Sequence, residues 1–421
     1  MPGIGAAGIA GLGIEQLTPP VQAALATATT GGTITAGTYR YVLTAINAVG
    51  ETNASNEQTI VTTGSTSTVT VTWTAVTGAT GYKLYKTAAG GASGTELLYR
   101  TVGLVTTDID TTPGSPAGAF PQSNTAATPG VYAAPTKFFP FNSESLASTQ
   151  ETVFRRPIRQ SADIIGAVPG FFHVEGDVEM EALEDVLVYF LYASRTLFVK
   201  TGTAPNFTYT ITPTAAGIPN KTLSLTMVRN NIVFGFTGVI TSSFTFGIEE
   251  GLLTFNTSMM GRDEAVASLP VPTWPVSTPF GAGMYSVEIP TGTPVLDTDT
   301  FEFTVEDNAE AQFRLKSTGR GAQFFNYGER NSTMSLERDF DSRADFDAYK
   351  SITAQSVTLT ATRTVNNVVS ILSPVAIKDT YEIANSGQGD LVRASISYQN
   401  VIDGTGKSWQ IVVKTQEEFF P

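Results

Sequence analysis

Polar and apolar residues alternate along residues 171–181, FFHVEGDVEME, with the period of two that is typical of a β-strand. One face of this strand carries Phe172, Val174 and Val178, and the other face carries mainly carboxylates. Over 183–191 the apolar spacing changes to three and four residues, and acidic residues occupy the first turn, where they favour a helix N-terminus. The pattern therefore predicts a strand with one acidic face, followed by an amphipathic helix.

Shorter alternating stretches separated by turn signals fill residues 19–112, a pattern that is typical of a small β-sandwich. Tyr41, Trp73 and Tyr82 fall at inward positions of these strands. Each aromatic ring of this kind buries roughly 150–250 Å², which is enough to hold two facing sheets together. We expect these three residues to form the core of the sandwich; exposed aromatic rings that bind sugars are the alternative.

The remaining segments complete a mainly β organisation. Residues 113–130, PGSPAGAFPQSNTAATPG, have the Pro, Gly, Ala and Ser content of a linker. Residues 131–421 return to alternating strands, with a second helix predicted over 341–352. The start of the chain is so rich in Gly and Ala that we expect residues 1–18 to form a mobile arm. The sandwich at 19–112 thus precedes a larger β domain, a barrel or sandwich with one or two helices.

Length, charge and cysteine content exclude several classes of protein. A chain of 421 residues exceeds the size of a single hydrophobic core, so we expect at least two domains. The formal net charge of −13 disfavours tight binding to nucleic acid or to an anionic membrane. The absence of cysteine excludes disulfides and thiolate chemistry. We expect neither a membrane span nor export, because no long apolar run and no basic leader precede the domains.

Three sequence features resemble catalytic or ligand-binding motifs, but each lacks residues or secondary structure that such a site needs. The one histidine, His173, lies within a predicted strand and cannot build a histidine metal cluster or a catalytic triad alone. GIGAAG at 3–8 has dinucleotide-fingerprint spacing, but no strand precedes it. RDFDSRADFD at 338–347 is similar to a calcium loop, but Arg343 occupies a ligand position and no glycine follows it. We predict no enzymatic activity, no cofactor and no metal.

A second acidic segment, 296–310, leaves two interpretations open. Its carboxylates either line a solvated channel or cover an ordinary solvated face. They are Asp297, Asp299, Glu302, Glu306, Asp307 and Glu310.

Two segments of the first predicted domain resemble a known module. TYRYVLTAINAVGET (38–52) and VTWTAVTGATGYKLY (71–85) are similar to a fibronectin type III or related immunoglobulin-like domain, with the Trp strand, the glycine corner and the hairpin in the expected order. Such modules act as binding or spacer units without chemistry of their own.

The larger domain resembles the tail tube protein, or major tail protein, of long-tailed bacteriophages. The resemblance is carried by four blocks in the same order: APTKFFPFNSESL (134–146), GFFHVEGDVEMEALEDVLVYFLYA (170–193), GFTGVITSSFTFGIEEGLLTFNTSMMG (235–261) and GQGDLVRASISYQNVIDGTGKSWQIVVKTQ (387–416). In family members a GxGIE start runs almost directly into the APT segment. Here the immunoglobulin-like module separates them, which indicates an insertion.

The resemblance implies a structural virion protein that assembles with itself into stacked, generally hexameric rings. Its partners would be further copies of itself, the tape measure protein and other tail proteins. Genomic DNA would pass through the tube during ejection without specific binding. The implied location is the phage tail, assembled in the host cytoplasm, with the inserted module outside the tube and host surface glycans as its possible ligands. The main alternative is a secreted or surface adhesin, or polysaccharide-binding protein, with a fibronectin type III module.

Two sets of candidate site residues follow from this resemblance. Glu175, Asp177 and Glu179 are candidates for the lumen wall, because carboxylates repel the phosphates of passing DNA. The candidates for contacts between rings are Ile14, Glu15, Pro135, Phe138 and Phe139.

Overall fold

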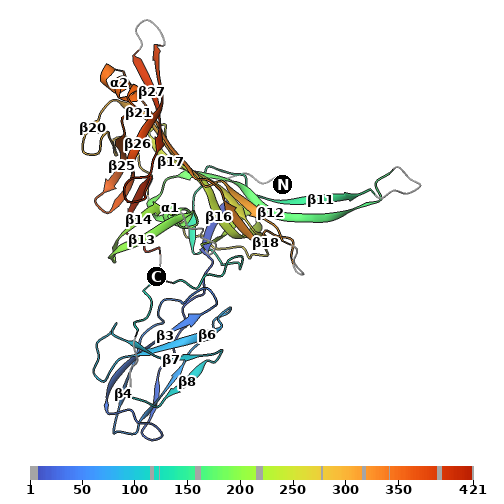
Figure 1. Cartoon of the computed structure of the whole chain (residues 1–421). Coiled ribbons are helices and arrows are strands. Elements are labelled where there is room, and N and C mark those ends of the chain that lie inside the picture. Colours follow the sequence, from blue (N-terminus) through green and yellow to red (C-terminus); the bar gives the residue numbers. More distant parts are fainter. Residues whose placement is uncertain are drawn as a thin grey trace. The chain divides into compact units, whose positions relative to one another are not determined.

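The computed structural model describes residues 8–113, 118–122, 124–156, 163–214, 221–275, 278–314, 319–340, 342–385 and 391–419. The chain divides into a main unit, formed by Met1–Ile14 and Gly130–Phe419, and an inserted unit built on Glu15–Pro129. The predicted mainly β fold is confirmed, and the described residues contain two helices (Figure 1).

The inserted unit is built from two antiparallel sheets. One sheet has the strand order β4-β3-β6-β7 and the other the order β2-β5-β8. The strands are β2 (Ala26–Ala28), β3 (Gly37–Ile46), β4 (Gln58–Thr62), β5 (Thr68–Thr72), β6 (Gly81–Lys86), β7 (Leu97–Val102) and β8 (Thr107–Asp110).

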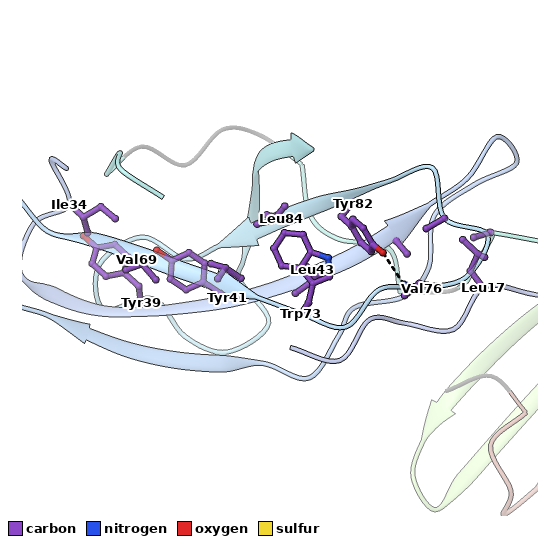
Figure 2. Packing of buried hydrophobic residues seen from close by; sticks show 14 residues of the cluster. Leu17, Ile34, Tyr39, Tyr41, Leu43, Val69, Trp73, Val76, Tyr82 and Leu84 are labelled. Atoms are coloured by element: carbon purple, nitrogen blue, oxygen red, sulfur yellow. Dashed lines mark hydrogen bonds between the residues drawn. The ribbon is translucent and has the colours of Figure 1, made fainter. Parts of the chain in front are cut away.

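The core of the inserted unit is a single cluster that contains Tyr41, Trp73 and Tyr82, all buried (Figure 2). The rings of Trp73 and Tyr82 meet edge to face at 5.3 Å. The Tyr82 hydroxyl accepts a hydrogen bond from the Val76 amide at 2.9 Å, so its one polar atom is satisfied in the core. These rings therefore pack the interior and are unavailable to a sugar.

The end of the predicted linker also packs on the inserted unit. Ala126 is fully buried, and its carbonyl accepts a hydrogen bond from the Leu17 amide at 2.8 Å. The Thr125 amide donates to Glu51 O at 2.9 Å. Small side chains, which suggested a flexible connection, here permit close backbone approach. The segment that leaves the unit is thereby bonded to the segment that enters it.

Two long strands connect the three antiparallel sheets of the main unit. The first half of β16 lies in a sheet with the order β9-β1-β15-β16-β18. Its second half lies in the central sheet, β11-β12-β17-β16-β21-β24-β27-β26, where β10 also pairs with β12. The first half of β26 belongs to a third sheet, β20-β19-β25-β26-β28-β14-β13. A hairpin of β22 and β23 stands beside them.

The strands of the main unit are β1 (Ile9–Ile14), β9 (Lys137–Phe139), β10 (Ser143–Glu144), β11 (Ala147–Arg155), β12 (Gly166–Glu181), β13 (Thr196–Thr203), β14 (Asn206–Pro213), β15 (Leu223–Arg229), β16 (Ile232–Glu249), β17 (Leu252–Gly261), β18 (Asp263–Ala265), β19 (Tyr285–Glu288), β20 (Pro294–Val295), β21 (Thr298–Glu306), β22 (Ala309–Gln312), β23 (Phe324–Tyr327), β24 (Asn331–Asp339), β25 (Gln355–Thr364), β26 (Asn367–Asn385), β27 (Val392–Asn400) and β28 (Gln410–Thr415).

The glycine-rich start of the chain differs from the expected mobile arm over residues 9–14. These residues form β1, which pairs with β15 on one side and β9 on the other. Ala10 and Leu12 are fully buried. A Cβ atom at Gly13 would lie 2.6 Å from the carbonyl oxygens of Ala133 and Ala134, so glycine is needed for this close packing.

Helix α1 (Glu184–Tyr192) follows β12 as expected, but it is buried along its whole length instead of exposing a polar face. Its acidic first turn is tolerated because both carboxylates are paired. Glu184 forms an ion pair with Arg363, and Asp185 Oδ2 lies 2.7 Å from Lys137 Nζ.

Helix α2 (Arg343–Lys350) lies within the second segment predicted to be helical. Ser342 Oγ caps it by accepting a hydrogen bond from the Ala344 amide at 3.2 Å. Asp341, the first residue of the predicted helical segment, lies outside the described residues. Phe346 and Tyr349 lie 5.6 and 6.0 Å from the Tyr381 ring, so α2 packs on β26.

Candidate channel face and assembly surfaces

The central sheet has one apolar face and one polar face. On β12, the exposed or partly exposed Glu175, Asp177 and Glu179 alternate with the buried Val174 and Val178. The apolar side chains pack into the core of the main unit, whose largest buried residue, Trp409, has its ring 5.9 Å from that of Phe244 on β16. The alternation read from the sequence thus places the three predicted lumen residues on one side of the sheet.

The antiparallel register extends this polar face over five strands, β12, β17, β16, β21 and β24. Three rows of directly paired residues cross these strands: Asp177–Ser258–Ser243–Glu306–Asn331, Glu179–Asn256–Thr245–Thr304–Thr333 and Glu181–Thr254–Gly247–Glu302–Ser335. These positions hold hydroxyl, amide and carboxylate side chains or glycine, without lysine or arginine. We call this surface the polar face; it also includes Glu175 within β12 and Glu337 near the end of β24.

Within the described ranges, no lysine or arginine neutralises the carboxylates of the polar face. Among the described residues, no lysine or arginine forms an ion pair with Glu175, Asp177, Glu179, Glu181, Glu302, Glu306 or Glu337. Their hydrogen-bond donors are hydroxyls: Ser258 Oγ donates to Asp177 at 2.6 Å, and Ser143 Oγ donates to Glu179 at 2.8 Å. His173 Nε2 lies 3.4 Å from Glu175. The face therefore presents negative charge to its surroundings.

The second acidic segment divides between the surface and the interior. Glu302 and Glu306 lie on the polar face, whereas Asp307 turns inward and is 1% exposed. Arg330 Nε lies 2.6 Å from Asp307 Oδ1. Asp297 pairs with Arg338 at 3.2 Å, Asp299 pairs with Arg393, and Glu310 lies on β22. Sequence periodicity could not distinguish the exposed Glu306 from the buried Asp307, because β21 ends at Glu306 and Asp307 no longer follows the alternation of the strand.

Strands β11 and β12 extend beyond the central sheet as a two-stranded hairpin (Figure 1). Every residue of β11 is exposed, and apolar side chains occupy both faces near its end. Val153, Phe154 and Val168 are 45%, 56% and 44% exposed. A two-stranded ribbon is at best marginally stable alone in water, and exposed apolar groups of this kind mark contact surfaces.

The residues predicted to contact a neighbouring ring lie mostly inside the chain. Phe138 and Phe139 are buried in the main unit, and Phe139 meets the Phe190 ring at 5.4 Å. Ile14 pairs with Leu223 at the end of β1, and Pro135 packs against Gly11. Glu15 is 1% exposed. The structure therefore brings Ile14, Pro135, Phe138 and Phe139 together as packing around β1. The sequence marks the exposed hairpin of β11 and β12 only by the alternation of its residues.

A family model described as phage tail tube protein matches residues 111–399. The chain belongs to the phage tail tube protein family. The matched range spans the main unit from β9 to β27 and leaves β1 and the inserted unit before residue 111 outside it. No curated protein matches the chain.

Membership of the phage tail tube family makes the protein a structural component of the phage tail, which fits a protein that is not an enzyme. In the part of the chain that the structure describes, no helix is both long and apolar enough to cross a membrane. The same residues contain no group of three or more His, Cys, Asp or Glu side chains placed to hold a metal ion.

Proposed function

We propose that this tail tube protein assembles into stacked rings of six subunits and that its polar face lines the conduit for the genome. The observation that carries the proposal is the continuity of the polar face over five strands, with carboxylates that pair with no lysine or arginine of the described segments. DNA bears a negative charge every ~1.7 Å of helix axis, so carboxylates in the wall repel it and hydroxyls do not attract it. A basic wall would bind the DNA. A wall of carboxylates and hydroxyls lets DNA slide.

Unpaired strand edges support self-assembly. Strand β13 pairs only with β14 among the described strands, and its Leu197 and Val199 are 56% and 46% exposed. An open edge with apolar side chains invites pairing with another chain. In the proposed ring, a neighbouring copy covers such surfaces. Other tail components, including the tape measure protein, would bind to the assembled tube.

The inserted unit is proposed to be an immunoglobulin-like module that decorates the outside of the tail. Tyr41, Trp73 and Tyr82 are buried in its core, so any contact with host surface glycans would use other, exposed side chains of the unit. Many copies along a tail would multiply a weak affinity for each site. The virion tail is the proposed location, with assembly in the host cytoplasm.

Electron microscopy of the purified full chain tests this function. Rings or tubes are expected, and a reconstruction should place Asp177 and Glu306 on the inner wall. A particle that stays monomeric over a wide range of concentration and salt, even with tail partners added, would reject the assembly. Tubes whose polar face points outward would reject the channel assignment alone.

A further inference from the structure

A pocket of about 500 Å³ opens at the root of the β11–β12 hairpin. Apolar walls come from Phe172, Val233 and Val266, and carboxylates come from Asp263 and Glu264 on β18. Both carboxylates are exposed, and neither forms an ion pair with a lysine or arginine in the described ranges. The pocket thus combines apolar contact area with two accessible negative charges.

The one basic side chain of this pocket is already engaged with its own hairpin. Arg320 Nη1 donates to Gln150 Oε1 at 2.9 Å and to Gly170 O at 3.4 Å. These bonds hold the guanidinium at the base of β11 and β12. Ser148 Oγ donates to Glu264 Oε2 at 2.6 Å and orients that carboxylate as well. Hydrogen bonds to β11 and β12 therefore fix both Arg320 and Glu264 at the edge of the pocket.

The distal part of the same hairpin has the complementary composition. Val153, Phe154 and Val168 are exposed there, next to the exposed Arg155 and Arg156. Neither guanidinium pairs with a described carboxylate. The tip therefore joins two adjacent positive charges to exposed apolar side chains, on a chain with a net charge of −13. We call Val153–Arg156 with Val168 the hairpin tip.

The tip cannot reach the pocket of its own chain. Phe172 in the pocket pairs with Gln150, and Arg155 lies five residues further along the ladder. At ~3.3 Å per residue this places the tip about 16 Å beyond the pocket, on a paired ribbon that points away from it. An arginine side chain does not span that length. The occupant must therefore come from another molecule.

We propose that the hairpin tip of one copy docks into the root pocket of the next copy. The proposal rests on the self-assembly proposed above. Arg155 and Arg156 of one subunit face Asp263 and Glu264 of its neighbour, while Phe154 covers the apolar wall. Because tip and pocket are different surfaces, the contact is heterologous and repeats from copy to copy, as a ring or a stack of rings requires.

Charge reversal in two complementary variants tests the contact in the full chain. Arg155→Glu/Arg156→Glu places an acidic tip against an acidic pocket, and Asp263→Lys/Glu264→Lys places a basic pocket against a basic tip. Like charges across an interface cost several kcal/mol, so each variant alone should need at least about tenfold more protein than wild type to form rings or tubes. An equimolar mixture should recover assembly, because every contact then joins opposite charges.

The outcomes separate this proposal from the proposed function. Normal assembly of either variant alone, or failure of the mixture while wild type assembles, would overturn the docking contact and leave the tube intact. Failure of wild type would overturn the function itself. Arg343→Glu, on the exposed surface of α2, is the matched control and should assemble as wild type. Equal thermal unfolding of all variants checks their folding.

Cysteine cross-linking gives a second measurement, because the chain has no cysteine of its own. Phe154→Cys with Val266→Cys should yield a ladder of disulfide-linked oligomers on oxidation. Phe154→Cys with Val365→Cys, in an exposed turn away from the pocket, should not. Equal ladders from both pairs, or none from the first, would contradict the docking.

Discussion

Lys86 and Asp110 form a fully buried ion pair that joins the two sheets of the inserted unit, with Lys86 Nζ 2.7 Å from Asp110 Oδ2. The Tyr41 hydroxyl donates to the same carboxylate oxygen at 2.9 Å, and the Thr112 amide donates to Asp110 Oδ1 at 3.1 Å. Burial, followed by the charge of Asp110, raises the pKa of Tyr41 far above its usual range. The phenol thus keeps its proton, and remains a donor to Asp110, above the pH at which a free tyrosine ionises.

Removing one partner of this pair should destabilise the inserted unit strongly. Lys86→Met leaves Asp110 buried without its cation, and the expected loss in the free energy of unfolding is about 3–5 kcal/mol. Hydrogen exchange of the β3 and β6 amides in the full chain measures it. Lys83→Met, which breaks the partly exposed pair with Glu51, should cost at most about 1 kcal/mol. Equal losses in the two variants would contradict a special role for the buried pair.

Adding a methyl group to β1 should loosen its docking. In Gly13→Ala the new Cβ meets two carbonyl oxygens at 2.6 Å, so we expect a loss of about 1–3 kcal/mol in the stability of the main unit, seen as a lower thermal midpoint. Gly281→Ala adds the same group into open space and should change stability by less than about 0.5 kcal/mol. An unchanged midpoint in Gly13→Ala would contradict the close packing of β1 against the carbonyl groups of Ala133 and Ala134.

Reversing charge on the polar face should make assembled tubes retain DNA. Glu302→Lys/Glu306→Lys replaces two unpaired carboxylates with cations that attract phosphate. Tubes of this variant should sediment with DNA near 50 mM salt and release it near 200 mM, because counterion release makes such binding salt-dependent. Wild-type tubes and a control with Glu329→Lys/Asp347→Lys, at exposed positions outside the polar face, should leave DNA in solution.

Lys221 should make the stability of the main unit rise with pH between about 8 and about 9. Burial lowers the pKa of Lys221 to about 8, below its ordinary value of 10.5. The unfolded chain therefore binds the proton more tightly in this interval, so stability should rise as pH rises through it. The pKa of Tyr209 is raised to about 12 from its ordinary value of 10, so this tyrosine ionises first in the unfolded chain and opposes the rise as pH approaches 10.

Substitution of Lys221 isolates this effect. Lys221→Met should raise the thermal midpoint at pH 7 and flatten its increase between about pH 8 and 9. Lys200→Met, a partly exposed lysine that pairs with Glu418, is the control and should keep the wild-type slope. A wild-type slope in Lys221→Met would show that another group titrates.

Local patterns predicted individual strands and faces well, because a period of two directly determines which side chains share a face. The positions of Val174, Val178 and the acidic residues between them follow from residues 171–181 alone. The burial of α1 on all sides did not follow, because it depends on Arg363 and Lys137, which are distant from α1 in the sequence. Composition was misleading for residues 9–14, where glycine serves close packing instead of flexibility.

The sequence by itself determined the mainly β class, the aromatic core of the inserted unit and the acidic side of β12, since these depend on residues close together in the chain. Only the tertiary structure decided which distant strands lie beside β12, and therefore that Glu302 and Glu306 extend the polar face while Asp307 is buried with Arg330. The physical reason is that sheet register is set by hydrogen bonds and packing between remote segments. A local pattern specifies the face of a strand but not its neighbours.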